Sequence, residues 1–557
     1  MKKRHRAGTA FGLFALGLFI VASNPGVPTA PSPKELEFGA FTDFRSGVRE
    51  FGELFKLIRS TLSHNKVTFQ GRTGPVSGFA AGTAYPQIWL RDANTIIPAS
   101  RFFYETPFLQ SWIEEHLAYQ RIDGSLEDWI DSRGKADKNT TETDQETSAV
   151  RAAAQVTRLA GTAWLEKKIE GATVLSRLER ALDSVLRLRF DKAHGLLTGA
   201  HTADWGDVDM NAPDQRAIYV DRATHWTCDI YDQSQFYAAA RDLAWMLAAA
   251  GRADKAGSWR EQAARIRKNA DQWLWQQDRG FFRVHIHLDA LKHDFVEDAM
   301  FAMGGNAEAM ISGLASDDQC RRIIETALAC QQRFSMSTIS GVLLPPYPQG
   351  FFKHPMMDQP YEYQNGGQWD WFGGKLVAAM FEHGFSRAAR EKLIEIAGKT
   401  IANKGLYEWD SPGGQGQGSA FYSGSAGSLG QALFEGYLGF KIARDSLSLE
   451  PKLSADRAAA HVFVPAAGAF AAYDYQWDER AGTVTFRYNS NLSGRGDVKI
   501  LIPWIGEAAA FAEGLKNIEV RRDGTKIAYQ TALVNNDAFL IVETDFKDRI
   551  LTIKRSR

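Results

Sequence analysis

Cysteine is scarce in this chain of 557 residues, which contains only Cys228, Cys320 and Cys330. An odd number leaves at least one thiol unpaired, so a fold held together by several disulfides is excluded. Cys320 and Cys330 are ten positions apart in one expected helix, which a disulfide would have to break. We therefore predict three reduced, mostly buried thiols. The Cys and His positions show no metal-ligand spacing, and a bound calcium ion is left open.

An excess of charge of either sign is also missing. The chain has 65 Lys and Arg against 66 Asp and Glu, which gives a formal net charge of −1. Nothing in this charge balance indicates electrostatic binding to nucleic acid or to a membrane surface. A neutral polar ligand fits it better than a polyanion. The length permits a large core and two or three domains.

A long hydrophobic run is lacking as well, because the apolar residues 11–22 are too few for a comfortable membrane span. This run follows a basic segment that contains Lys2, Lys3, Arg4 and Arg6, and small residues at 21–23 offer a cleavage site. We predict a signal peptide at 1–23, a proline-rich linker at 24–43, and export to the periplasm or the cell exterior. No stable membrane span remains after cleavage; an uncleaved anchor is the alternative.

Helical periodicity dominates from about residue 44 to 440. Apolar residues recur at spacings of three and four in ten segments: 44–63, 108–120, 146–159, 174–188, 229–250, 254–274, 321–332, 373–382, 387–402 and 426–437. The connections are alternately short and long, and the long ones contain clusters of Trp, Asp, Glu and Gly. This pattern predicts a barrel of helical hairpins over residues 44–445, with a functional face built from the long loops.

Alternating apolar and polar residues replace the helical period near residue 448. Seven such segments, separated by turn signals such as Arg522-Asp523-Gly524, predict a β-sandwich over residues 446–557. This region lacks a cluster of candidate catalytic residues. We expect it to buttress the barrel, with a separate carbohydrate-binding function as the alternative.

An arginine and an aspartate stand together in Trp89-Leu90-Arg91-Asp92. The guanidinium can donate to vicinal sugar hydroxyls and the carboxylate can accept from them, beside the flat ring of Trp89. The other interpretation is a structural ion pair at the start of a helix, which the aspartate would cap. Further along the chain, acids recur in segments 123–129 and 144–147. The second segment ends a polar loop and starts a helix, so helix capping explains its acids well enough, with a binding role as the alternative.

Three carboxylates follow one another closely in Asp204-Trp205-Gly206-Asp207-Val208-Asp209. If they converge, their mutual repulsion favours keeping one of them protonated, as a general acid requires. A solvated acidic turn or a calcium-binding loop is the alternative, although the spacing does not match an EF-hand. The residues alone do not choose between Asp204, Asp207 and Asp209.

Two later segments combine aromatic rings with polar side chains. Residues 361–371 bring together amides, aromatics and glycines, including Gln364, Asn365 and Trp369, and make a plausible sugar subsite. Glu408-Trp409-Asp410 precedes the Gly-rich stretch 413–425, where an acid beside an adjustable loop could position a water. Paired acids lined with indole rings are what glycoside hydrolysis needs, because one carboxyl protonates the leaving oxygen and the other activates water or attacks.

In this order the loops resemble motifs of the six-hairpin, (α/α)6-barrel glycosidases. That group includes glycoside hydrolase family 63, the glucosidase domain of glycogen debranching enzymes, glucoamylases and neutral invertases. Trp89-Leu90-Arg91-Asp92 is similar to the glucoamylase Trp-x-Arg-Asp element, whose Arg and Asp hold the non-reducing sugar. Segment 195–207 is similar to a debranching-enzyme segment that ends in Trp-x-Asp, whose Asp is the general acid. This likeness selects Asp207.

Two further elements carry the resemblance. Residues 363–369 are similar to a shared Tyr-His-Asn-Gly-x-x-Trp element, with Gln364 in place of the usual His. Gly405-Leu406-Tyr407-Glu408 is similar to a Gly-Leu-Pro-Glu element that carries the general base, with Tyr407 in place of Pro. The resemblance covers roughly residues 44–440. Each motif is weak alone, and four in the expected order are much stronger.

The resemblance implies a mainly α fold, with an (α/α)6 barrel followed by the small β-sandwich, and no metal or other cofactor. It implies catalytic Asp207 and Glu408, and substrate-binding residues Trp89, Arg91, Asp92, Trp205, Gln364, Asn365, Trp369 and Trp409. The reaction would invert the anomeric carbon of an α-glucoside or α-mannoside in an oligosaccharide or polysaccharide. The two carboxyl groups would then face each other across one pocket.

Two alternatives remain at this level. A glycoside phosphorylase on the same fold would need cationic residues near the phosphate, and near Glu408 the sequence offers only Lys404. A non-catalytic carbohydrate-binding protein is the alternative from another class of function. A polysaccharide lyase finds no support in a chain of near-zero net charge.

Overall fold

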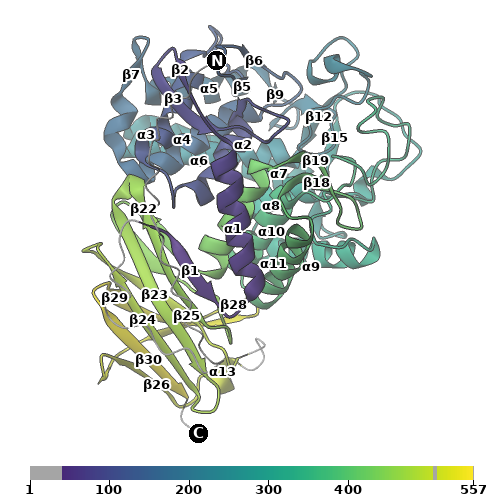
Figure 1. The fold of residues 1–557 in the computed structure, drawn as a ribbon. Coiled ribbons are helices and arrows are strands. Elements are labelled where there is room, and N and C mark those ends of the chain that lie inside the picture. The colour runs from purple at the N-terminus through teal and green to yellow at the C-terminus, as the bar shows by residue number, and fades with distance from the viewer. Residues whose placement is uncertain (1–40, 506–510, 556–557) are drawn as a thin grey trace, which may run out of the picture.

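The computed structural model describes residues 41–505 and 511–555, which form a helical part and a strand-rich C-terminal part (Figure 1). The predicted signal peptide, and the linker up to residue 40, lie outside the described residues. Over the described ranges, the prediction of a mainly helical chain with a strand-rich C-terminal region is confirmed. The sandwich lies at one end of the helical part (Figure 1).

The helices of the first part alternate along the chain between those that form a closed ring and those that pack against that ring. Its helices within the described ranges are α1 (Arg49–His64), α2 (Leu90–Ser100), α3 (Thr106–Ala118), α4 (Asp144–Ala160), α5 (Val174–Leu188), α6 (Ile230–Ala249), α7 (Ala253–Trp273), α8 (Met303–Ser312), α9 (Asp317–Arg333), α10 (Asp370–Glu382), α11 (Ser386–Ala402) and α12 (Ser423–Gln431). The even-numbered helices contact one another in a closed order, from α2 through α12 and back to α2, and each odd-numbered helix packs against an even-numbered one. This arrangement fits a glycosidase fold of the (α/α)6 type.

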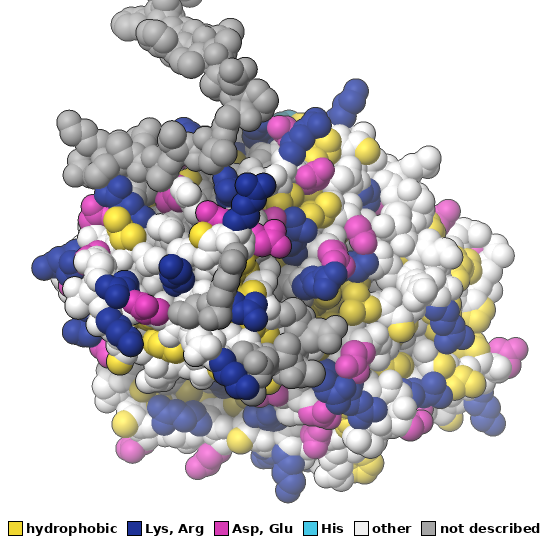
Figure 2. Space-filling view, turned by 90° about the horizontal axis from the view of Figure 1, so that it is seen from below, with side chains coloured by type: hydrophobic (Ala, Val, Ile, Leu, Met, Phe, Trp, Pro, Cys, Tyr) yellow, Lys and Arg dark blue, Asp and Glu magenta, His cyan; other side chains and the backbone are white. Residues whose placement is uncertain are grey.

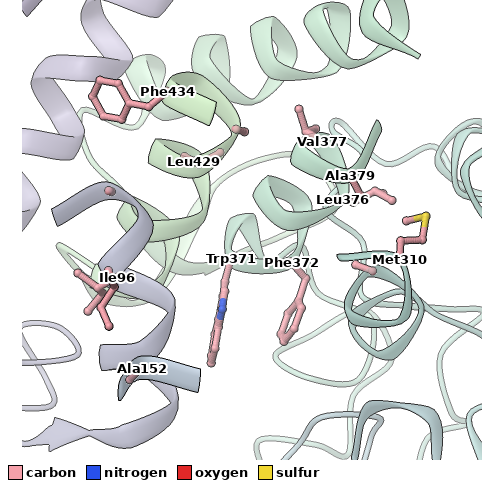
Figure 3. Close-up of a cluster of buried hydrophobic side chains, with 14 of the residues drawn as sticks. Ile96, Ala152, Met310, Trp371, Phe372, Leu376, Val377, Ala379, Leu429 and Phe434 are labelled. Carbon is pink, nitrogen blue, oxygen red and sulfur yellow. The ribbon is translucent and has the colours of Figure 1, made fainter. Parts of the chain in front are cut away.

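The even-numbered helices bury side chains toward a common centre. Ile96 of α2, Met310 of α8, Trp371 and Phe372 of α10 and Leu429 of α12 belong to one hydrophobic core (Figure 3). All residues of α2 are buried, and so are nearly all residues of α8 and α10. A helix that is buried on every side has no polar stripe, so its sequence carries little amphipathic signal. The sequence accordingly does not predict α2 or α8.

The C-terminal part contains two sheets. The first joins β1 (Asp43–Ser46), β22 (Ala458–Val464), β23 (Ala469–Asp478), β24 (Thr483–Ser490), β30 (Arg549–Arg555), β26 (Ile518–Arg522) and β27 (Thr525–Lys526) in that order. The second joins β20 (Phe440–Ala443), β21 (Ser446–Leu449), β25 (Arg495–Leu501), β29 (Asp537–Asp545) and β28 (Gln530–Val534). The rings of Phe440 and Tyr473 stack at 5.0 Å, which joins the two sheets. Strands β1 and β20 precede the domain boundary that we predict at residues 445–446, although both belong to these two sheets.

Polar contacts attach the sandwich to the helices. The Asp537 carboxylate accepts a hydrogen bond from the backbone N–H of Ser386 at 3.1 Å, at the start of α11. Arg390 of the same helix donates to Asp456 at 2.8 Å. On the face shown in Figure 2, Lys and Arg side chains are interspersed with Asp and Glu.

Short ribbons connect the helices at the end of the helical part away from the sandwich (Figure 1). They are β4 (Ile88–Trp89) with β5 (Trp129–Ile130) and β6 (Ala136–Asp137), then β11 (Gly199–Ala200) with β12 (Trp226–Asp229) and β15 (His285–His287), and finally β18 (Tyr407–Asp410) with β19 (Gly416–Ala420). The acid-bearing motifs of the sequence lie in these ribbons or beside them. The prediction of long functional loops at one end of the helices therefore agrees with the arrangement.

The three cysteines of the described residues are in the state that the sequence predicts. Cys228, Cys320 and Cys330 are free, and Cys228 and Cys320 are buried, which confirms the prediction of unpaired, mostly buried thiols. In residues 41–505 and 511–555, no helix combines the length and the apolar character that a membrane crossing requires.

We predict that Asp537→Ala lowers the free energy of unfolding by about 1–3 kcal/mol, because the buried N–H and hydroxyl of Ser386 lose their acceptor. Asp548→Ala is the control, since it removes a half-exposed partner of Arg487 and should cost less than about 1 kcal/mol. Urea unfolding of both variants measures the difference. Equal decreases in the free energy of unfolding would show that the Asp537 contact stabilises the fold no more than the partly exposed Asp548 contact does.

Candidate active site

The three acids of the loop 204–209 have different surroundings. Asp204 is buried, and its carboxylate accepts the backbone N–H of Gly305 at 2.9 Å. Asp209 is buried and accepts the N–H of Asn211 at 2.7 Å. Asp207 alone keeps 18% of its side chain exposed. Among the three, Asp207 is therefore the acid that a ligand can reach.

Asp204 shows why a shifted pKa does not identify the acid by itself. Burial raises its pKa to about 8, against the lowering effect of the Gly305 N–H. Its carboxylate nevertheless faces the start of α8, where a Cβ on Gly305 would lie 2.7 Å from the Asp204 Oδ1. The two glycines at 304–305 thus let the loop pack directly onto the helix. This contact fixes the loop that carries Asp207.

Asp207 itself contacts two of the residues that the sequence singles out. The Gln364 side-chain amide donates to Asp207 Oδ1 at 3.0 Å. The Arg91 guanidinium lies 3.9 Å from Asp207 Oδ2. The backbone carbonyl of Asp207 accepts a hydrogen bond from the Thr141 hydroxyl at 3.0 Å. Four separate segments of the chain therefore meet at this residue.

Glu408 lies on β18 and is 3% exposed. Its carboxylate accepts the Tyr85 hydroxyl at 3.1 Å and the backbone N–H of Ser419 at 2.9 Å. The strand pairing of β18 with β19 is irregular between Tyr407 and Trp409. Opposite it, Gly418 has a positive φ of 67°, and a Cβ there would lie 2.4 Å from Glu408 Oε2. The glycine therefore makes room for the carboxylate.

The pKa of Glu408 is raised to about 7. Burial is the largest cause, and the negative charges of Asp207 and Asp92 add to it. The hydrogen bonds from Ser419 and Tyr85 act in the opposite direction because they stabilise the ionised form. Glu408 is thus a carboxyl that changes its charge near neutral pH.

The charges of Glu408 and Asp207 raise the pKa of the same two tyrosines. Burial raises the pKa of Tyr85, and the charges of Glu408, Asp207 and Asp92 raise it further. Tyr363 is also buried, and its pKa is raised by that burial and then by both Glu408 and Asp207. The two acids that lie far apart in the sequence therefore share one electrostatic environment.

Arg91, in the first turn of α2, is the cation of this environment. It forms a short ion pair with Glu142 and lies 3.5 Å from Asp144, in addition to its contact with Asp207. Its guanidinium also lies 5.9 Å from the ring centre of Trp371. Burial disfavours its charge, but these carboxylates outweigh that effect and raise its pKa. Arg91 remains charged and holds the acids together.

Several buried polar atoms of these residues have no hydrogen-bond partner among the described residues. They are Asp92 Oδ1, Trp89 Nε1, Arg91 Nε and Gln364 Oε1. Donors and acceptors are both present in this group. Each of these atoms is enclosed by protein, so a ligand could reach it only if neighbouring side chains moved.

Three residues that we predict to bind sugar are enclosed by protein. Trp205 is 3% exposed and meets the ring of Trp369 edge-on at 4.6 Å. Trp369 is 1% exposed and donates its indole N–H to the Tyr363 carbonyl at 2.9 Å. Asn365 is fully buried and bonds to the backbone of Tyr347. Their positions favour supporting the loops over touching a sugar.

The other predicted binding residues lie nearer to solvent or to the acids. Trp89 and Trp409 are partly exposed, so their rings could meet a ligand. Arg91, Asp92 and Gln364 belong to the electrostatic environment of the two acids, and their contact with sugar stays a prediction.

Sequence reasoning missed three contributors to this site. Tyr85 lies just before the Trp-x-Arg-Asp motif, Ser419 lies in the Gly-rich stretch, and Glu142 precedes the acids assigned to helix capping. The proximity of Tyr85 to the motif was the one usable signal. Ser419 meets Glu408 across the hairpin of β18 and β19, and Glu142 meets Arg91 from a separate segment.

One group of described residues could hold a metal ion, namely His201, His287 and Glu297. The sequence shows no such spacing, because His201 lies far from the other two. These side chains are distinct from the partners of Asp207 and Glu408 given above.

We predict that Gly418→Ala lowers the free energy of unfolding by about 1–3 kcal/mol, because an alanine must adopt a left-handed backbone there and would displace Glu408. Gly413→Ala in the same stretch is the control, since Gly413 has no left-handed φ and its Cβ would make only an ordinary contact, with Ser411 Oγ at 3.9 Å. Chemical denaturation of the two variants provides the measurement. A tolerated alanine at 418 would contradict the tight fit around Glu408.

Comparison with known proteins places this site in a family context. Residues 85–303, which include Arg91 and Asp207, match the model of the mannosylglycerate hydrolase MGH1-like glycoside hydrolase domain. No curated protein sequence matches this chain.

Solved structures share its fold at low sequence identity. An alpha-L-rhamnosidase from Dictyoglumus thermophilum is 12% identical with a TM-score of 0.63, over 92% of this chain and 50% of that one. A GH78 family rhamnosidase of a Bacillus species is 15% identical with a TM-score of 0.58, over 81% of this chain and 42% of that one. A GH63 mannosylglycerate hydrolase from Thermus thermophilus is 15% identical with a TM-score of 0.50, over 68% of this chain and 99% of that one.

This chain therefore spans half or less of the two rhamnosidases, and at these identities the likeness concerns the fold. The family match covers the loop of Asp207. Residues 85–303 thus match a glycoside hydrolase domain, and the chain shares its fold with solved structures that include a GH63 enzyme.

Proposed function

We propose that this chain is an inverting glycoside hydrolase with an (α/α)6 barrel, which cleaves α-linked glucosides or mannosides in oligosaccharides. Asp207 is the general acid that protonates the glycosidic oxygen, and Glu408 is the general base that deprotonates a water. The observation that carries the proposal is the meeting of these two carboxyls in one electrostatic environment. Each acts on Tyr85 and Tyr363, and the charge of Asp207 acts on Glu408.

The surroundings of the two carboxyls suit these roles. A base works best when its pKa lies near the working pH, and the pKa of Glu408 is raised to about 7. Asp207 is the more exposed of the two and is open to a leaving oxygen.

Gln364 can accommodate both protonation states of Asp207. Its amide nitrogen donates to the ionised carboxylate at 3.0 Å, and its amide oxygen is buried without a partner among the described residues. Rotation of the amide would present the oxygen to a protonated carboxyl. The glutamine can therefore remain bonded to the acid before and after proton transfer.

Sugar binding would use the side chains beside the acids, with Asp92 as an acceptor of hydroxyl hydrogens and Arg91 as a donor. The partly exposed rings of Trp89 and Trp409 would cover the apolar face of a sugar ring.

Water, rather than phosphate, suits the position beside Glu408. Its hydrogen-bond donors in the described chain are a tyrosine hydroxyl and a backbone N–H, which can hold a carboxylate ready to accept a proton. Lys404 remains the only cation close to it in the sequence. We therefore propose hydrolysis over phosphorolysis.

We also propose that the protein is exported to the periplasm or the cell exterior. The support is the basic and then apolar order of residues 2–22.

Loss of either carboxyl tests the roles. We expect Asp207→Asn and Glu408→Gln each to lower kcat/KM by about 10²–10⁴-fold on a good substrate, because each removes one proton transfer. The substrate comes from a panel of α-glucosides, α-mannosides, α-L-rhamnosides and mannosylglycerate, assayed with and without phosphate. Calorimetry of sugar binding should show little change in Kd.

Asp214→Asn is the control, since Asp214 is exposed and pairs with Arg216 near the same loop. Its activity should equal that of the parent chain. Full activity of either active-site variant would refute the assignment. NMR of the first product anomer should show inversion, and a phosphate requirement would instead indicate a phosphorylase.

The pH profile tests Glu408 separately. As a base it must be ionised, so kcat/KM should rise with pH and level off above about pH 7, following its raised pKa. Tyr85→Phe removes a hydrogen bond that stabilises the ionised form, so this limb should move to higher pH.

The matched control for that variant is Tyr219→Phe, which removes an exposed hydroxyl bonded to Asp137 at 2.6 Å. In this variant, kcat/KM should rise over the same pH range as in the parent chain. A Tyr85→Phe profile that is unchanged, or that moves to lower pH, would argue against Glu408 as the titrating base.

A further inference from the structure

Three imidazoles and a tyrosine hydroxyl surround the buried carboxylate of Glu297. His201 Nε2 lies 3.2 Å from Glu297 Oε1, and His287 Nε2 lies 2.7 Å from Oε2. His285 Nδ1 lies 3.5 Å from Oε1, and Tyr347 donates its hydroxyl to the same oxygen at 2.7 Å. The catalytic roles proposed above use none of these groups.

We propose that His201, His287 and Glu297 bind one divalent transition-metal ion, with zinc as the best match. Their three donor atoms all lie within 4.8 Å of one another. Ligands at about 2.0–2.2 Å from a tetrahedral zinc ion stand about 3.3–3.5 Å apart. The observed distance of 3.2 Å between His201 and Glu297 is close to that edge. His287, at 2.7 Å from Glu297, would have to move outward by a few tenths of an ångström to make room for the ion.

The charge balance of the cluster favours a cation. Glu297 is 6% exposed, and its ion-pair partners in the described chain are these histidines, with no Lys or Arg among them. A buried carboxylate requires a compensating positive charge. The rings of His201 and His285 lie only 4.3 Å apart, so repulsion opposes a positive charge on both. A metal ion compensates the carboxylate and leaves the imidazoles neutral.

The donor set also decides the class of metal. Imidazole nitrogens with a single carboxylate suit zinc and neighbouring transition metals, whereas calcium and magnesium prefer oxygen ligands. The calcium that the sequence leaves open is therefore not the ion for this cluster.

A metal here would connect the segments that carry the active-site loops. His201 lies between β11 and the loop of Asp207, and His287 belongs to β15, which pairs with β12 at the other edge of the same three-stranded sheet. Tyr347 bonds to Glu297 through its hydroxyl and to Asn365 through its backbone, next to Gln364. The ion would thus be structural, holding in place both Asp207 and the glutamine that contacts it.

Metal titration of the full chain tests the proposal. After chelation and dialysis, the protein should take up one equivalent of zinc, measured by elemental analysis and calorimetry. Cobalt should give the visible absorption of a protein-bound ion, and zinc should displace it. His287→Gln removes a ligand that is 19% exposed and should weaken zinc binding by about 100-fold.

His194→Gln is the matched control. His194 is 24% exposed and contacts Asp191 at 2.7 Å, so it has nearly the same exposure and the same carboxylate distance as His287, outside the cluster. Its zinc affinity should equal that of the parent chain. Absence of saturable zinc and cobalt binding would overturn the proposal and leave Glu297 as a hydrogen-bonded anion. Equal weakening in both variants would overturn it too.

Discussion

The active site depends on how one buried guanidinium compensates several carboxylates. Arg91 contacts Glu142, Asp144 and Asp207, all on segments that come from other parts of the chain. Without its charge, these acids would repel one another in a buried environment, and their segments would move apart. Because Arg91 lies in the first turn of a helix that is buried on every side, its position is set by the packing of the helical ring. The core of the fold thus determines where the acids meet.

The tryptophans show how the same core serves the site indirectly. Trp205 packs against Trp369 and Phe372, so the loop of Asp207 is anchored to the start of α10. Gly304 and Gly305 let that loop lie directly on α8. Aromatic side chains near the candidate acids are therefore not all exposed to a ligand. Here the buried rings set the position of the acid, and Trp89 and Trp409 remain as the partly exposed ones.

Local patterns predicted some elements closely and missed others for a physical reason. Helix α5 begins and ends where its apolar spacing predicts, because it buries one face, exposes the other and has Thr173 as its cap. Helix α8 begins with Met303 followed by two glycines and is almost entirely buried, so neither propensity nor periodicity reveals it. Asp207 and Glu408 could be named as candidates because each lies in a recognisable motif, and Tyr85 lies just before another. Glu142 and the histidine cluster could not be named, since their partners are distant in the sequence.

The glutamine at position 364 determines which charges lie next to the carboxylate of Asp207. The related motifs have a histidine there, whose charge would vary across neutral pH and alter the field at the neighbouring carboxyl. An amide is neutral at every working pH, and it contacts Asp207 through a hydrogen bond of 3.0 Å. The nearby cation, Arg91, is also permanently charged. Gln364 therefore offers Asp207 a neutral hydrogen-bond donor at every working pH, whereas a histidine at this position would add a positive charge as the pH falls.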